Sequence, residues 1–108
     1  MKDFEKIIWR DAVSCFLFAA SWCGACRAIQ PVIDRFQIQM NGRVDIDRVD
    51  IDDPDLRGIV RRYRITAVPT LLFFRRGELL WRHAGTTAYE NLVAALDRIE
   101  RYKYACYF

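Results

Sequence analysis

The sequence has little of what several protein classes require. It contains only four cysteines in 108 residues, too few for a secreted domain stapled by disulfides. No apolar run approaches the roughly 18 residues that a membrane-spanning helix needs. The first ten residues mix charged with apolar side chains and lack the apolar core of a secretory signal. These absences favour a protein of the reducing cytoplasm that contacts no membrane.

The charge pattern also excludes a class of partner. The net charge is +3, and the basic residues are scattered apart from short clusters at 61–64 and 75–76. Short runs of this kind are typical of a solvated helix end and of a hairpin tip. Nucleic-acid binding needs a continuous basic face with exposed aromatic residues, and the sequence shows none. We therefore expect no nucleic-acid partner.

The length and the first half of the chain indicate one α/β domain spanning residues 1–108. The chain has 108 residues, which is enough for one domain and too few for two. Apolar residues make up 53% of the sequence, enough to form one core. The run at 13–20 is apolar almost throughout, as in a central strand covered on both faces. From 24 to about 40 the apolar residues recur along one helical face. Pro31 lies inside this pattern, where it removes a backbone donor and should kink the helix.

The next segments predict a second strand and a second helix. Residues 43–52 alternate strictly at first, but the apolar positions change phase near Arg48, which predicts a bulge or the strand's end. Asp53 and Pro54 then form a helix start, with Asp as cap and Pro at the first helical position. The order of strand, helix, strand and helix predicts a parallel arrangement.

The second half of the chain predicts an antiparallel hairpin over 71–82, with its turn at 75–78. A last amphipathic helix follows, and Thr87 with Glu90 three residues later predicts a capping box at its start. Asp3 is expected to cap a short helix at the beginning of the chain.

Cys23 and Cys26 stand two residues apart, between the first strand pattern and the long helical pattern. In a cytosolic chain this spacing beside a βαβ pattern indicates a redox pair. The unpaired amides of the first helical turn point toward the first sulfur, so we expect the pKa of Cys23 to be lowered. Cys26 lies one turn further in and is expected to remain a thiol at neutral pH.

Four features of the chain resemble the thioredoxin family. The segment Trp22-Cys23-Gly24-Ala25-Cys26 is similar to the family's Trp-Cys-Gly-Pro-Cys, and Pro31 matches the kink proline of the active-site helix. Val68-Pro69-Thr70 resembles the cis-proline loop, and the hairpin at 74–78 followed by Gly85 resembles the region beside the substrate groove. The resemblance implies a thioredoxin-like α/β fold, with a central mixed sheet of about four strands and helices on both faces.

By this resemblance the chain would be a thiol–disulfide oxidoreductase that reduces protein disulfides. Cys23 would attack the partner's disulfide, and Cys26 would resolve the mixed disulfide. A reductase or another external thiol donor would recycle the pair, and no cofactor is expected beyond the redox-active disulfide itself. The groove for an extended substrate segment would be lined by Trp22, Ala67, Val68, Pro69, Ala84 and Gly85.

Ala25 and Leu17 depart from the family pattern. Gly24 and Ala25 let the two sulfurs approach without crowding, but alanine in place of proline leaves the first helical turn looser. Leu17 stands six residues before Cys23, where the family buries an aspartate that helps to remove the second cysteine's proton. Leucine cannot take a proton, so we expect a stable fold and a slow reductase. Arg48 lies near the position of a family lysine and is expected to face solvent.

Two other functions stay open, and the remaining cysteines and the histidine have ordinary structural interpretations. One alternative function is that of a disulfide isomerase or oxidant. The other is a thioredoxin-fold interaction module with weak turnover, and Leu17 supports this one because it cannot accept a proton. We expect no metal site, because a closed site needs four converging ligands. Cys15 lies back along the strand, Cys106 is at the far end, and His83 is the only histidine. Cys15 is expected to be a core residue, and His83 an ordinary edge-strand residue.

Overall fold

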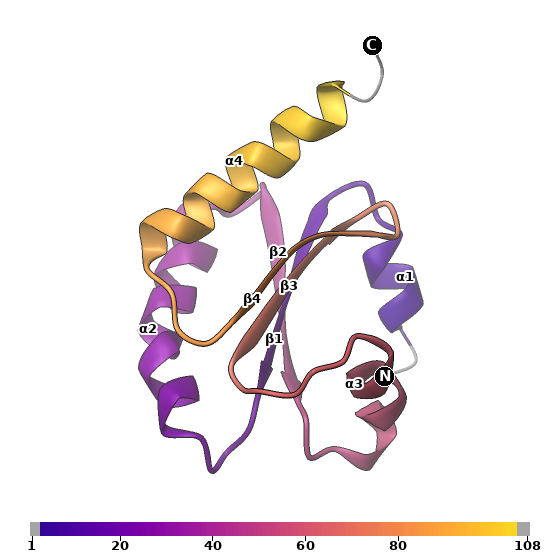
Figure 1. Cartoon of the computed structure of the whole chain (residues 1–108). Coiled ribbons are helices and arrows are strands. Elements are labelled where there is room, and N and C mark those ends of the chain that lie inside the picture. Colours follow the sequence, from indigo (N-terminus) through magenta and orange to yellow (C-terminus); the bar gives the residue numbers. More distant parts are fainter. Residues whose placement is uncertain (1–2, 106–108) are drawn as a thin grey trace.

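The computed structural model describes residues 3–105 and shows one sheet between two layers of helices (Figure 1). The strand order is β2-β1-β3-β4. The central strand β1 (Val13–Ala19) pairs parallel with β2 (Val44–Asp50) and antiparallel with β3 (Thr70–Arg75). The hairpin partner of β3 is β4 (Glu78–Ala84), which forms the other edge. The expected mixed four-stranded α/β sheet is confirmed.

Helices cover both faces of this sheet. On one face lie the long helices α2 (Gly24–Gln39) and α4 (Tyr89–Ala105), as Figure 1 shows. On the other face lie α1 (Phe4–Ile8) and α3 (Arg57–Arg62), the latter preceded by the 3-10 turn η1 (Pro54–Leu56). The expected segments all form, and four residues, 20–23, connect the end of β1 to the start of α2.

The central strand supplies side chains to both cores. Cys15 and Leu17 belong to the core beneath α2 and α4, whereas Phe16 and Phe18 belong to the core beneath α1 and α3. All four are 0% exposed. Successive side chains of a strand point to opposite faces, so a strand covered on both sides must be apolar throughout. This burial explains the unbroken apolar run that the sequence shows before the cysteine pair.

The phase change in β2 has a different cause from the predicted one. The pairing of β1 with β2 continues without a register shift along the whole strand, so the prediction of a bulge or strand end near Arg48 is wrong. Val44 and Ile46 pack on the core beneath α2 and α4, and Val49 packs on the opposite core. The apolar side chains therefore change face within a continuous strand. Arg48 and Asp50 occupy the positions on the α2 side that the change leaves polar.

The predicted helix caps are only partly correct. Asp53 caps as expected, because its Oδ1 accepts the backbone N–H of Asp55 at 3.0 Å. Asp3 occupies the N-cap position of α1, but its side chain makes no capping hydrogen bond there within the described residues. The Thr87 hydroxyl accepts the side-chain amide of Asn91 at 3.2 Å in place of the predicted capping box. Residue type marks a helix start, whereas backbone geometry decides whether the side chain reaches an amide.

The hairpin turn is tied to the loop after α1. The backbone N–H of Gly77 donates to the carbonyl of Ile8 at 2.7 Å, and that of Arg76 donates to the carbonyl of Arg10 at 3.0 Å. Gly77 has φ +81°, and a Cβ at this position would lie 2.6 Å from ring carbons of Trp9. The turn therefore needs glycine both for its backbone conformation and for the space that the indole occupies.

Candidate redox site

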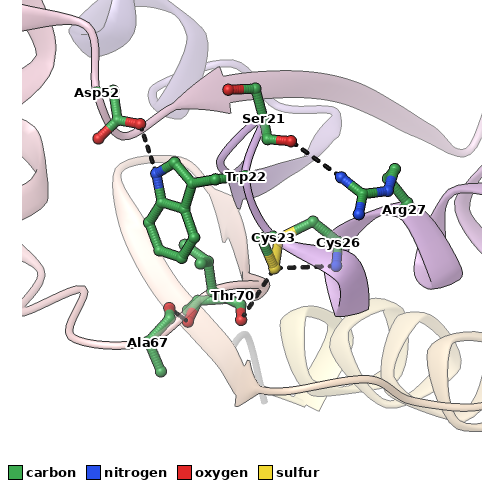
Figure 2. The surroundings of a disulfide bond; sticks show 9 residues. Ser21, Trp22, Cys23, Cys26, Arg27, Asp52, Ala67 and Thr70 are labelled. Atoms are coloured by element: carbon green, nitrogen blue, oxygen red, sulfur yellow. Dashed lines mark hydrogen bonds between the residues drawn. A yellow bond between two sulfur atoms is a disulfide. The ribbon is translucent and has the colours of Figure 1, made fainter.

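The cysteine pair lies at the start of α2. Cys23 is the N-cap residue of this helix and Cys26 lies in its first turn. The two residues form a disulfide with Cα atoms 5.3 Å apart, inside the range that disulfides adopt (Figure 2). Their exposed fractions are 7% and 2%, so only the first sulfur is near the surface. The junction of strand and helix brings the two sulfurs within bonding reach.

The sulfur of Cys23 has a hydrogen-bonding partner for each protonation state. The backbone N–H of Cys26 donates to it at 3.1 Å, and this amide belongs to the positive end of α2. Such a donor favours the thiolate over the thiol. The carbonyl oxygen of Val68 lies 3.6 Å from the same sulfur and can accept a hydrogen bond from the thiol. The geometry therefore supports an ionisable nucleophile at Cys23.

The loop before β3 faces this sulfur. The Val68–Pro69 peptide bond is cis, as the family resemblance implies. The Thr70 hydroxyl donates to the carbonyl of Ala67 at 2.6 Å, and the backbone N–H of Gly85 donates to the carbonyl of Pro69 at 2.7 Å. Gly85 has φ +96°, a conformation in which glycine carries no steric cost. These bonds hold the loop with Val68 against the disulfide.

The predicted groove residues differ in exposure. Trp22 is 66% exposed, and its Nε1–H donates to Asp52 Oδ2 at 2.8 Å (Figure 2). Trp22 is therefore a surface residue and not part of the core. Ala67 and Ala84 are also exposed, Val68 and Gly85 are half-buried, and Pro69 is buried. Asp52 could not be singled out from the sequence, because it is one of several aspartates in a polar run.

No acid lies beneath the pair at the position of Leu17. This side chain is fully buried in the core under α2 and α4. Its neighbour on β2 is Arg48, whose guanidinium contacts Asp34 Oδ1 at 2.7 Å and Gln30 Oε1 at 3.1 Å, both on α2. Arg48 is exposed, as expected, and α2 also holds its guanidinium in place through these contacts.

The supporting residues of the helix start are exposed. Gly24 begins α2, Ala25 follows it, and Pro31 lies inside the helix as predicted. A Cβ at Gly24 would meet only the side chain of Arg27, at 3.8 Å, an ordinary contact distance.

The remaining thiol and imidazole candidates do not join this site. Cys15 is fully buried, and burial raises the pKa of its thiol far above the usual range, as expected of an inert core residue. His83 stacks on Trp81 with ring centroids 5.7 Å apart, and its Nε2 lies 3.0 Å from the carbonyl oxygen of Thr86. The sequence ends in an aromatic-rich segment at 102–108, and its last residues, including Cys106, lie outside the described residues.

The described residues contain neither a cluster of metal ligands nor a helix suited to span a membrane. Among residues 3–105, no group of three or more His, Cys, Asp or Glu side chains is placed to hold a metal ion. In the same part of the chain, none of the helices is long and apolar enough to cross a membrane.

Comparisons with known proteins agree with this geometry. A family model described as Thioredoxin matches residues 1–98. The thioredoxins of Staphylococcus epidermidis and Staphylococcus aureus are each 32% identical over 96 residues, which cover 89% of this chain and 89% of theirs. The crystal structure of thioredoxin from Trypanosoma brucei brucei has a TM-score of 0.82 at 26% identity, covering 94% of this chain and 86% of that one.

The crystal structure of a thioredoxin from Malassezia sympodialis has a TM-score of 0.79 at 28% identity. The match covers 90% of this chain and 83% of the Malassezia chain. The family match therefore extends over nearly the whole sequence, and the two cysteines of the family motif lie at bonding distance. The chain belongs to the thioredoxin family of thiol–disulfide oxidoreductases.

Proposed function

We propose that this chain reduces disulfide bonds in other proteins, with Cys23 as the nucleophile and Cys26 as the resolving cysteine. One observation carries the assignment of these roles. The Cys23 sulfur accepts a hydrogen bond from a backbone N–H of the first helical turn. Cys23 is also the less buried of the two cysteines, 7% exposed against 2% for Cys26. A thiolate is the reactive form of cysteine, so the cysteine at the helix start attacks first.

The reaction proceeds in two exchanges. The thiolate of Cys23 attacks one sulfur of the partner's disulfide, forms a mixed disulfide and releases the partner's other sulfur as a thiolate. Cys26 then loses its proton and attacks the Cys23 sulfur. The Cys23–Cys26 bond forms and the second partner sulfur leaves with the bonding electron pair. Two electrons have moved from the dithiol to the partner, whose two thiolates take up protons.

The partner binds on the surface around the cis-proline loop. The exposed indole of Trp22, fixed by Asp52, stands beside the nucleophile, and the Val68 carbonyl faces the same sulfur. We assign substrate contacts to the residues that border this position. They are Trp22, Ala67, Val68, Pro69, Ala84 and Gly85.

The oxidised pair needs an external source of electrons. A reductase or a small dithiol must reopen the Cys23–Cys26 bond before the next cycle, and the exposed edge of Cys23 is the point of attack. We place this cycle in the cytoplasm, where thiols are kept reduced. The chain's own redox-active disulfide is the only carrier that this cycle requires.

Leu17 supports a second candidate, a thioredoxin-fold module that binds partners without efficient turnover. Its buried side chain offers no proton acceptor beneath the pair. Reduction of insulin by dithiothreitol, followed by turbidity, separates the two functions. We expect the wild-type chain to accelerate precipitation and the Cys23→Ser variant to leave it at the rate of dithiothreitol alone. Equal rates for the two proteins would favour the binding module.

A further inference from the structure

The resolving step leaves a chemical question at Cys26. Its thiol must lose a proton before its sulfur can attack Cys23, and burial opposes formation of the charged thiolate. Leu17, directly in the core below, has no atom that accepts a proton. An efficient step therefore needs another base within hydrogen-bond reach of the thiol, directly or through one water molecule.

A hollow of about 330 Å³ opens beside Cys26 on the α2 side of the sheet. This volume has room for several water molecules, since each occupies about 30 Å³ in the liquid. The polar residues that line it come from the loop after β1, from α2 and from β2. They are Ser21, Arg27, Gln30, Arg48 and Asp50.

Strand register places Asp50 on the same face as Leu17. Leu17 pairs with Arg48, and Ala19 pairs with Asp50, so Asp50 is one strand over and two residues closer to the redox pair. Arg48 contacts Gln30 of α2, which fixes the direction of alternate side chains in β2. Neighbouring strands lie about 4.8 Å apart. A carboxylate thus stands at the same sheet face as the position where the family has its aspartate.

The carboxylate of Asp50 is oriented by a hydrogen bond, and no cation among the described residues forms an ion pair with it. Its Oδ1 accepts the backbone N–H of Asp52 at 3.0 Å, which orients the group. The two guanidinium groups of the hollow are committed elsewhere: that of Arg48 to α2, and that of Arg27 to the carbonyl of Ser21 at 3.0 Å. Among the ion pairs of the described residues, none includes Asp50.

We propose that Asp50 accepts, through water in this hollow, the proton that Cys26 releases during resolution of the mixed disulfide. The proton moves to the carboxylate as the Cys26 sulfur bonds to Cys23, and the bond from Cys23 to the partner's sulfur breaks. The leaving thiolate carries away the electron pair and is protonated by solvent. This inference rests on the proposed roles of Cys23 and Cys26 and adds a residue that the family pattern does not supply.

The test isolates resolution from protein substrates by using Ellman's reagent as the disulfide. Attack by Cys23 releases one thionitrobenzoate, and attack by Cys26 on the resulting mixed disulfide releases a second, so stopped-flow absorbance separates the two steps. All variants carry Cys106→Ser, which leaves the pair as the reactive thiols beside the buried Cys15. Asp50→Asn should slow the second release about a hundredfold, the low end of general-base effects, and leave the first unchanged.

Two variants make the result specific to the carboxylate. Asp50→Glu should restore most of the second rate. Asp45→Asn, which removes a charge from the opposite face of β2, should change neither rate. A wild-type second rate in Asp50→Asn, an equal loss in Asp50→Glu, or a loss in Asp45→Asn would each overturn the inference. Failure of the proposed function would appear separately, as a missing second release in the wild-type protein or as no insulin reduction.

Discussion

The redox loop at one end of the sheet and the hairpin turn at the other are fastened to the fold in different ways. At the redox end, the cis-proline loop faces Cys23 and the exposed Trp22 is held by a hydrogen bond to Asp52. Small residues such as Ala20 pack around the disulfide. Each of these contacts orients a group near the sulfurs.

The opposite end is tied at several points. Two backbone hydrogen bonds join the hairpin turn to the loop after α1, and the indole of Trp9 covers Gly77. Asp11 pairs with Arg75 and Arg76, and Arg43 bridges to the last helix. Exposed ion pairs contribute little individually, so the backbone bonds and the indole packing dominate.

The comparison indicates that contacts at the hairpin end mainly stabilise the fold, whereas contacts at the redox end mainly position the reacting groups. Substitutions at the hairpin end should change the free energy of unfolding without changing catalysis. Substitutions beneath the redox pair should change both. The following substitutions test this division.

Leu17→Asp should have the largest effect and should change stability and rate in opposite directions. A carboxylate in this fully buried site costs about 3–5 kcal/mol of unfolding free energy, because no partner compensates its charge. The same group can accept the Cys26 proton, so the second release of thionitrobenzoate should accelerate. Urea unfolding and the stopped-flow assay measure the two quantities.

Leu17→Asn is the matched control for this variant. It introduces a polar group of similar size that takes no proton, so it should destabilise the fold and leave the second release no faster. A folded Leu17→Asp protein with the wild-type rate would refute the role given to the missing acid.

Gly77→Ala should cost about 2 kcal/mol of unfolding free energy and leave activity per folded molecule unchanged. The positive φ is unfavourable for alanine, and the new Cβ would lie 2.6 Å from the Trp9 ring. Gly42→Ala is the control, since φ there is +89° but nothing lies within 4 Å of the added Cβ. It should cost about 1 kcal/mol, from backbone conformation alone. Equal losses in the two variants would show that the indole does not fix the turn.

Asp47→Asn should have the smallest effect, visible as a change in pH dependence. Burial raises the pKa of Asp47, Arg10 lowers it and Asp45 raises it. A carboxyl group with a raised pKa binds its proton more tightly in the folded state, so its contribution to stability falls as pH rises through the unfolded and then the folded pKa. The asparagine variant should therefore gain stability relative to wild type between acidic and neutral pH. Urea midpoints measured across this range should converge at the acidic end, and a constant difference would contradict the assignment.

Most of the fold could be predicted from local patterns, because the spacing of apolar residues shows which faces of a strand or helix are buried. The apolar run of β1, the helical period of α2 and the turn residues of the hairpin each predict an element that the structure contains. The phase change in β2 misled the prediction because a sequence does not show when a strand's cover changes from one face to the other. Capping residues misled it at Asp3 and Thr87 because reach depends on backbone angles.

The cysteine pair was visible in the sequence, whereas its polar surroundings were not. Cys23 and Cys26 are separated by only two residues, so their spacing in the chain brings them together. The register of β2 beside β1 brings Arg48 into contact with the redox helix and places Asp50 in the lining of the hollow beside it. Nothing in an alternating run of aspartates distinguishes the one that faces the hollow. The roles of the groove residues stay predictions that binding measurements must test.

The closed environment of Cys15 gives the protein an internal reporter. Its sulfur lies at the centre of the sheet, shielded on both sides and held in the unreactive protonated form. A thiol reagent can modify it only when the strands separate. The rate of that modification therefore follows the opening of the molecule's interior, independently of the electrons exchanged at its surface.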